Sequence, residues 1–167
     1  MIQIVRANLV IGSDGSTTIN GRSAGLSSLA DRNRFHEMRQ GFDAILIGGE
    51  TARREPYQKT PIPLVVISRS LNLPESISLN PSHHIWNIPP NAAIERSLSE
   101  FGNALLIEGG AKFLSASLPW VTEIAITRSQ VAGGENRIDL DRLIKDFSLT
   151  SEEIVESEKF QLFKRAN

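Results

Sequence analysis

The chain has 167 residues, of which 40% are hydrophobic and 22% are charged, and its formal net charge is −1. This length suits one globular domain with a substantial core, so we expect a single domain over residues 1–167. The charges are balanced and no long lysine or arginine run occurs, which argues against nucleic acid or a membrane surface as the partner.

Cysteine is absent, which excludes disulfides, thiol nucleophiles and zinc sites built on cysteine. The three histidines, His36, His83 and His84, lack suitably spaced partner ligands, so we expect no metal site. No stretch approaches 18 consecutive apolar residues, and an arginine interrupts the apolar residues near the N-terminus, unlike a signal peptide. We therefore expect a cytoplasmic protein.

Strands and helices are predicted to alternate along the first part of the chain. Residues 2–11 are rich in β-branched side chains and predict a buried strand that ends in the turn sequence Gly-Ser-Asp-Gly. Ser28, with an aspartate three residues later, is a candidate N-cap for a helix over about 28–40. The near-continuous apolar runs at 43–48 and 62–68 predict strands of a parallel sheet that is covered on both faces.

The alternation continues through the second part of the chain. The predicted elements are a short strand over 84–88, a helix over 91–102 with Gly102 as its stop, a strand over 104–110, a short helix ended by Pro119, and strands over 123–129 and 160–165. This order is typical of an α/β protein with a mainly parallel central sheet.

Two of the predicted strands end in paired glycines, Gly48 with Gly49 and Gly109 with Gly110. Ligands of parallel α/β sheets bind outside the carboxyl ends of the strands, where glycine lets backbone N–H groups approach phosphate oxygens. Neither a GxGxxG fingerprint nor a P-loop occurs, so a tight turn explains either pair about as well when it is considered alone.

The sequence Ser-Arg-Ser at the end of the 62–68 strand is a second candidate ligand contact. The Ser68 hydroxyl and the Arg69 guanidinium together can bind a phosphomonoester. Alone, the triplet is better explained by a solvated loop arginine. Its expected place on the same sheet edge as both glycine pairs is what favours a ligand.

Four segments together resemble one known family. They are VRANLVIGSDGSTTINGRSAGLSS, DRNRFHEMRQGFDAILIGGETARREPY, VVISRS and LLIEGG, in order between residue 5 and about residue 128. They look like the reductase family of riboflavin biosynthesis, a dihydrofolate-reductase-like domain that is fused to a deaminase in many bacteria. The resemblance implies a three-layer α/β/α fold with a mixed, mainly parallel central sheet. It also implies NADPH as cofactor and reduction of the ribosyl group of 5-amino-6-(5-phosphoribosylamino)uracil to a ribityl chain.

The resemblance also implies roles for single residues. Those implied for the cofactor are Gly48, Gly49 and Thr51 along the site, Ser68 and Arg69 at the 2′-phosphate, and Gly109 and Gly110 at the pyrophosphate. Those implied for the substrate are Asn8, Arg39, Arg53 and Glu108, with Arg39 suited to the substrate phosphate. Hydride transfer to an imine carbon would be favoured by a nearby carboxylate, for which Glu55 and Asp14 are the candidates. Structural alternatives are a helix C-cap for Arg39 and a turn aspartate for Asp14.

Several departures from the family pattern leave the substrate open. The usual Ser-Leu-Asp-Gly turn is here the sequence of residues 12–15, Gly-Ser-Asp-Gly, and Asn8 stands where many members have lysine. A reductase of another heterocyclic or carbonyl compound, or a non-catalytic nucleotide-binding protein of the same fold, is therefore the alternative. A folate-type reductase ranks low, because its Trp-x-x-Pro-x-(Asp/Glu) motif is missing, and deaminase activity is excluded by the missing CxxC pair.

A homodimer is expected from the same resemblance. The segment 118–128, LPWVTEIAITR, is rich in β-branched residues and is a candidate for the dimer seam, where sheet edges of two subunits would meet.

Overall fold

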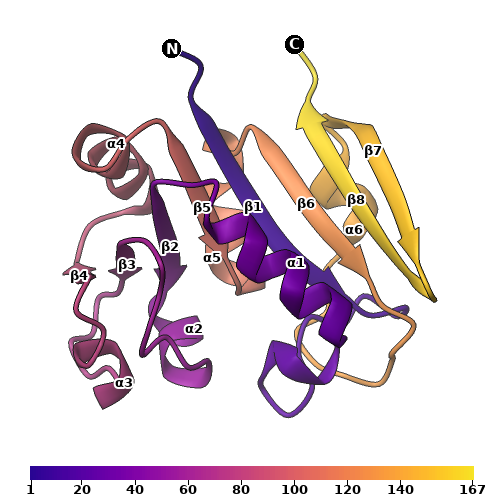
Figure 1. Ribbon diagram of the computed structural model, residues 1–167, viewed down its shortest axis with the longest axis horizontal. Helices are drawn as coiled ribbons and strands as arrows, with labels where there is room; N and C mark the ends of the chain where they lie inside the picture. The colour runs from indigo at the N-terminus through magenta and orange to yellow at the C-terminus, as the bar shows by residue number, and fades with distance from the viewer.

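An eight-stranded sheet in the order β4-β3-β2-β5-β1-β6-β8-β7 organises the computed structural model, which describes residues 1–167 (Figure 1). The strands are β1 (Ile4–Ile11), β2 (Ala44–Gly48), β3 (Leu64–Ile67), β4 (His83–Trp86), β5 (Ala104–Glu108), β6 (Glu123–Arg128), β7 (Phe147–Val155) and β8 (Glu158–Arg165). The helices are α1 (Leu29–Arg39), α2 (Gly49–Arg54), α3 (Glu75–Ser78), α4 (Pro90–Glu100), α5 (Ala111–Ser117) and α6 (Leu140–Ile144), with 3-10 turns at Ser23–Gly25 and Leu118–Trp120. None of the helices has the length and apolar character that a membrane crossing requires.

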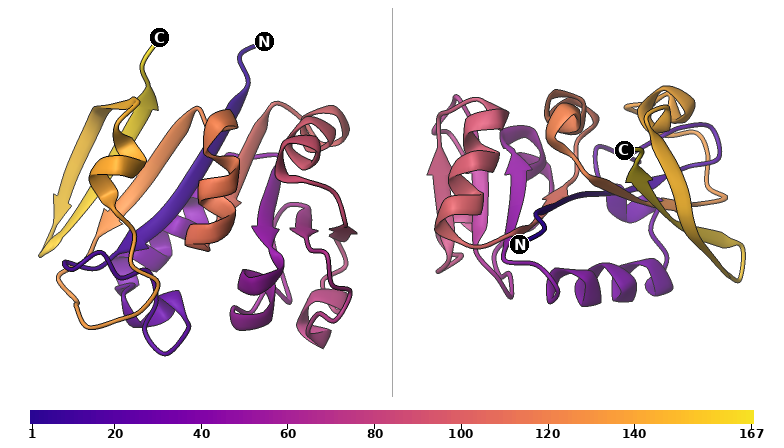
Figure 2. Two further views of the ribbon diagram at one scale, coloured as in Figure 1. Left: turned by 180° about the vertical axis from the view of Figure 1, so that it is seen from behind. Right: turned by 90° about the horizontal axis from the view of Figure 1, so that it is seen from above.

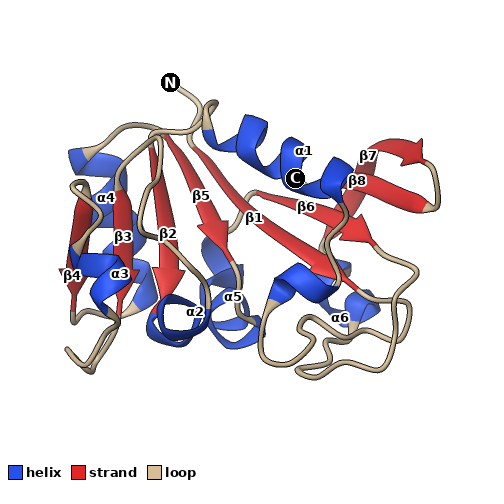
Figure 3. Ribbon diagram, turned by 60° about the horizontal axis from the view of Figure 1, so that its bottom comes forward, coloured by secondary structure: helices blue, strands red, loops and turns tan.

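The sheet is mixed and mainly parallel, as predicted. Neighbouring strands from β4 to β6 pair in parallel, whereas β8 runs antiparallel to both β6 and β7. The carboxyl ends of the parallel strands consequently meet at one edge of the sheet, next to α2, α5 and the longest loops (Figure 3).

Helices cover both faces of the sheet, which confirms the predicted three-layer α/β/α fold. Helix α1 lies on one face, and α4, α5 and α6 lie on the other (Figure 2). Alternate residues of β2 enter two separate apolar clusters, with Ala44 and Leu46 in the larger and Ile45 and Ile47 in the smaller. A strand buried on both faces has no polar side, which explains why β2 reads as a continuous apolar run.

The predicted helix ends agree with the structure at two positions. The Ser28 hydroxyl caps α1 by accepting a hydrogen bond from the backbone N–H of Asp31 at 3.0 Å. Gly102 follows the last turn of α4 with a φ of 142°, a conformation that L side chains rarely adopt. The stop predicted at this glycine is therefore confirmed.

The region after β6 is more structured than the sequence indicated. Only the last strand, near 160–165, was expected there, and the structure adds β7 as its hairpin partner and the short helix α6. Residues 148–154 of β7 are exposed at an edge of the sheet, so they carry no alternation of apolar and polar residues that would reveal a strand.

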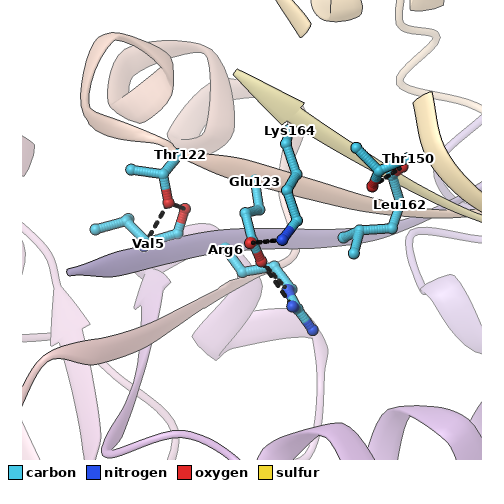
Figure 4. A network of polar contacts seen from close by, with 7 residues as sticks. All are labelled: Val5, Arg6, Thr122, Glu123, Thr150, Leu162 and Lys164. Carbon is cyan, nitrogen blue, oxygen red and sulfur yellow. Dashed lines mark hydrogen bonds and ion pairs between the residues drawn. The ribbon is translucent and has the colours of Figure 1, made fainter. Parts of the chain in front are cut away.

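Strand β6 is an interior strand, so the expectation that residues 118–128 supply a free sheet edge is wrong. It pairs with β1 on one side and β8 on the other. Polar contacts tie these three strands together (Figure 4). Glu123 of β6 binds the Arg6 guanidinium at 2.6 Å and the Lys164 ammonium at 3.2 Å, one on each neighbouring strand. The free edges of the sheet are β4 and β7.

Candidate active site

A cavity of about 1350 Å³ lies at the carboxyl edge of the sheet. The ends of β1, β2, β3 and β5 and the segments that follow them form its floor, and α1 and the loop before it form one wall. Such a crevice outside the carboxyl ends of parallel strands is where open α/β sheets bind their ligands.

The cavity brings together nearly all of the predicted site residues, which come from five separate parts of the chain. Its lining includes Asn8, Arg39, Gly48, Gly49, Thr51, Arg53, Glu55, Ser68, Arg69, Glu108, Gly109 and Gly110. Asp14 is the one candidate that lies outside it.

Asp14 belongs to the loop after β1 and lines a smaller hollow beside α6. Its carboxylate accepts hydrogen bonds from the hydroxyl and N–H of Ser16 and from the N–H of Gly133, and it pairs with Arg137 at 3.1 Å. The Ser16 hydroxyl is the main cause that holds the pKa of Asp14 far below its usual value. These contacts are those of a turn aspartate, the structural alternative stated for this residue.

Arg39 and Glu108 form a buried ion pair beneath the cavity. Nε and Nη2 of Arg39 donate to the two carboxylate oxygens of Glu108, each at 2.8 Å. The side chains are only 9% and 1% exposed. Burial is the largest single influence on the pKa of Arg39 and lowers it, but the hydrogen bond and charge of Glu108, with smaller contributions from Tyr57, together outweigh burial and leave that pKa raised. The two residues were predicted separately as substrate contacts, and the structure makes them partners of each other.

Tyr57 completes this group and was missed by the sequence reasoning. Its hydroxyl donates to Glu108 at 2.7 Å, and the Arg39 guanidinium lies 5.4 Å from the centre of its ring. Burial, followed by the nearby Glu108 charge, raises the pKa of Tyr57 well above its usual value, so the hydroxyl keeps its proton. The available sequence signal was that Tyr57 is the only tyrosine of the chain and lies two residues after the candidate Glu55.

The glycine pairs let the strand ends pack tightly against one another. A Cβ at Gly49 would lie 2.5 Å from the Ser68 hydroxyl oxygen, and one at Gly109 would lie 2.8 Å from a Thr51 methyl carbon. Gly109 and Gly110 also have positive φ, at 68° and 65°. The same residues therefore satisfy a packing requirement inside the protein and leave backbone at the surface of the cavity.

The Ser68 hydroxyl stabilises the turn that residues 68–70 form. The Ser68 hydroxyl donates to the carbonyl of Ser70 at 2.7 Å and accepts from its N–H at 3.2 Å. The Arg69 side chain is exposed and has no ion pair or hydrogen bond of its own. Arg69 is thus the free cation of this turn, whereas the Ser68 hydroxyl already has protein partners.

Glu55 follows α2 and is partly buried in the cavity wall. One of its carboxylate oxygens accepts a 2.6 Å hydrogen bond from the N–H of Ser23, in the loop before α1. This contact joins the end of α2 to the loop across the cavity and fixes one carboxylate oxygen.

Positive charge gathers along the cavity walls. The eight basic lining residues are Arg22, Arg32, Arg39, Arg53, Arg54, Arg69, Lys112 and Arg137, and the four acidic ones are Asp31, Glu50, Glu55 and Glu108. The lining therefore carries a formal charge of 8 − 4 = +4, although the chain as a whole carries −1. Sequence reasoning did not find Arg22, Arg32 or Lys112, because nothing in their local sequence distinguishes them from surface charges.

Known structures share this fold over nearly the whole chain. A pyrimidine reductase-like protein from Corynebacterium diphtheriae superposes with a TM-score of 0.76 at 17% identity, and the match covers 99% of this chain and 92% of that one. RibD from Acinetobacter baumannii gives a TM-score of 0.78 at 17% identity, covering 99% of this chain and 59% of that one.

A third similar structure is a diaminohydroxyphosphoribosylaminopyrimidine deaminase/5-amino-6-(5-phosphoribosylamino)uracil reductase from Thermotoga maritima. Its TM-score is 0.72 at 14% identity, with 99% of this chain and 57% of that chain covered. The chain thus spans less than two thirds of the length of this protein and of the Acinetobacter one. No curated protein matches the sequence. The profile of the RibD C-terminal domain matches residues 3–119, well over half of the chain, and the chain therefore belongs to that family.

Proposed function

We propose that this chain is an NADPH-dependent reductase of riboflavin biosynthesis, acting in the cytoplasm as a homodimer on 5-amino-6-(5-phosphoribosylamino)uracil. The observation that carries the proposal is the positive cavity at the carboxyl edge of the sheet, because a dinucleotide phosphate and a phosphorylated substrate are both anions. Family membership supports the same reaction class.

The residues at the β2, β3 and β5 ends fit NADPH. Gly109 and Gly110 precede α5, whose first N–H groups have no partner within the helix and suit a pyrophosphate. Gly48, Gly49 and Thr51 would lie along the same cofactor. Arg69 is free to bind a 2′-phosphate through its planar fork, with Ser68 beside it.

The opposite end of the cavity fits the phosphorylated substrate. Arg22 and Arg32 are exposed there and have no protein partners, so they suit the substrate phosphate better than Arg39, which is already paired with Glu108. Asn8 and Arg53 would contact the substrate from β1 and α2. Arg39 would act on the substrate through the orientation that it gives to Glu108.

NADPH, when bound, supplies the hydride. The protein has to hold the imine carbon of the ring-opened ribosyl group close to the donor and favour its protonated form. Glu55 has one oxygen fixed by the Ser23 N–H and lies in the cavity wall, where its negative charge would stabilise the protonated imine. Asp14 lies outside the cavity, so it would support the reaction only indirectly, by stabilising the loop after β1.

Reduction of a different heterocyclic or carbonyl compound is the second candidate function. The observation that favours it is the identity of residue 8. Asn8 pairs with Glu108 in the β1–β5 register, and many members of the family have lysine in place of this asparagine. If the lysine ammonium of those relatives binds a group of the pyrimidine substrate, the neutral Asn8 amide would not bind that group in the same way, which would favour a different substrate.

The first test compares NADPH and NADH by fluorescence titration in wild type, Arg69→Ala and Arg142→Ala. Arg142 is an exposed, unpaired arginine on α6, away from the cavity, and controls for the lost charge. We expect a strong preference for NADPH that falls in Arg69→Ala alone. Oxidation of NADPH by the pyrimidine substrate would then test the reaction. Failure to bind either nucleotide would contradict the proposed reductase and favour a non-catalytic, scaffolding protein of the same fold.

A further inference from the structure

The loop between β1 and α1 contains a tight turn whose tip faces an acidic side chain from a distant loop. Residues 19–22 form a two-residue hairpin turn, with mutual backbone hydrogen bonds between Ile19 and Arg22 at 2.8 and 3.1 Å. Asn20 and Gly21 at its tip have φ values of 50° and 76°, as a turn of this size requires. The N–H groups of both tip residues are then free to bind an acceptor outside the turn.

Glu135, in the loop after β6, supplies that acceptor. One carboxylate oxygen accepts from the N–H of Asn20 at 3.0 Å, and the other accepts from the N–H of Gly21 at 3.2 Å and from the Thr18 hydroxyl at 2.9 Å. The Gly21 N–H is the main cause that lowers the pKa of Glu135, with further help from the Thr18 hydroxyl. One side chain thus satisfies both exposed donors of the turn.

The backbone fixes Glu135 in this position. Its N–H donates to the carbonyl of Thr18 at 2.8 Å, and its carbonyl accepts from the N–H of Thr17 at 3.1 Å. The neighbouring Gly134 allows this approach, since a Cβ there would lie 2.1 Å from the Thr18 carbonyl oxygen. The carboxylate therefore does not need to be ordered separately to bind the turn.

The turn leads directly into the candidate active site. Arg22 follows the tip and lines the cavity, and the N–H of Ser23 donates to Glu55 at 2.6 Å. Segment 20–23 is consequently held by a carboxylate at each end, Glu135 outside the cavity and Glu55 inside it. A shift of the turn would displace the donor that fixes Glu55 and the guanidinium of Arg22 together.

We propose that Glu135 is a positioning residue that holds the 19–22 turn and, through it, orients Glu55 and Arg22 at the substrate end of the cavity. It lies beyond residues 3–119, the segment that the family profile covers. The catalytic part of the inference rests on the proposed function, but the hold on the turn does not, and the two parts can be tested separately.

The experiment uses Glu135→Ala, Glu135→Gln and the control Glu95→Ala, which removes an exposed and unpaired carboxylate from α4. Trypsin cleavage after Arg22 in the folded protein, followed by mass spectrometry, reports on the turn without any need for activity. We expect cleavage to be about tenfold faster in Glu135→Ala, intermediate in Glu135→Gln, which keeps one acceptor, and unchanged in Glu95→Ala.

Steady-state kinetics then test the effect on the site. In Glu135→Ala we expect kcat to fall about tenfold and KM for the pyrimidine to rise, because a small displacement of a catalytic group is costly. KM for NADPH should stay within about twofold, since its predicted contacts lie at the other end of the cavity. Glu135→Gln should recover part of the loss.

Two outcomes would overturn the proposal. The first is a Glu135→Ala protein that trypsin cleaves after Arg22 no faster than wild type. The second is equal loss of affinity for both ligands together with lowered resistance to urea, which would make Glu135 a residue of general stability. A wild-type protein without reductase activity would reject the proposed function instead, while the cleavage result would still decide whether Glu135 holds the turn.

Discussion

Arg39 and Glu108 meet through two parallel hydrogen bonds of 2.8 Å in a region that solvent hardly reaches. This pairing changes the role that we expect for Arg39. The Glu108 carboxylate neutralises the Arg39 charge and takes two of its five N–H donors, so Arg39 attracts a phosphate less than an unpaired arginine does, and we expect it to serve the cavity by orienting Glu108. The free cations, of which Arg22 and Arg32 are examples, are the ones left for anionic ligands.

Breaking the buried pair should be costly. We expect Arg39→Met to lower the free energy of unfolding by roughly 3–5 kcal/mol, because it leaves the Glu108 charge buried without its cation. Urea unfolding measures the change. Arg32→Met, on the exposed side of the same helix, is the control and should change stability by less than about 0.5 kcal/mol. Similar losses in the two variants would contradict a structural role for the pair.

The Tyr57 hydroxyl makes a separate contribution. Tyr57→Phe removes one hydrogen bond to a charged acceptor and leaves the ring in place, so we expect a loss of about 1.5–3 kcal/mol. Equilibrium unfolding of this variant beside wild type checks the value. A stability equal to that of wild type would mean that the hydroxyl adds nothing to the orientation of Glu108.

Gly109 and Gly133 offer a matched comparison between backbone strain and close packing. Both have positive φ, 68° and 86°, but a Cβ at Gly133 would meet nothing within 4 Å, whereas one at Gly109 would meet Thr51 at 2.8 Å. We expect Gly133→Ala to cost about 1–2 kcal/mol from the left-handed conformation alone. Gly109→Ala should cost more and also weaken NADPH binding.

A second substitution tests the cause of that difference. Thr51→Ala removes the two atoms that an added Cβ at position 109 would meet most closely, Cγ2 at 2.8 Å and Oγ1 at 2.9 Å, so the double variant should regain stability relative to Gly109→Ala alone. Strictly additive losses, measured by thermal unfolding, would show that the two positions do not share the contact.

The titration of Glu123 should make the free energy of unfolding depend on pH. Burial raises the pKa of Glu123, but the hydrogen bond from Arg6 and the charges of Arg6 and Lys164 outweigh it and lower that pKa overall. Its stabilising effect is therefore complete above the unfolded value of about 4.3 and is lost as pH falls through the lower folded value. Between neutral pH and pH about 3, wild type should lose more stability than Glu123→Gln.

Urea midpoints measured across this pH range check the prediction. Glu37→Gln, which alters an exposed and unpaired carboxylate on α1, is the control and should follow the wild-type curve. Parallel curves for wild type and Glu123→Gln would show that the contacts in Figure 4 do not influence the titration.

The positive lining of the cavity predicts that nucleotide binding depends on salt. Raising ionic strength shortens the distance over which exposed charges act, from about 10 Å at 0.1 M to about 3 Å at 1 M. NADPH affinity should fall over this range, and the fall should be smaller in Arg69→Ala because one exposed cation is missing. Titrations at four salt concentrations measure both slopes, and a flat wild-type response would rule out attraction by the lining.

Much of the fold was predictable because the apolar runs that form β2 and β3 are continuous, which is the pattern of strands buried on both faces. The position of the site followed from the same logic, since parallel strands end at one edge. Strand β7 was not predictable, because its exposed residues show no alternation. The pairing of Arg39 with Glu108 joins residues far apart in sequence, and only the packed structure selects such a partner.

The strand order also determines when the sheet can form during synthesis of the chain. Strand β1 pairs only with β5 and β6, so residues 4–11 have no partner in the sheet until the chain has been synthesised beyond residue 104. Contacts between such distant segments form slowly, because a long loop has to close before they can stabilise anything. An emerging chain therefore carries β1 unpaired until β5 has been synthesised, and β5 is the strand that joins β1 to β2 in the sheet.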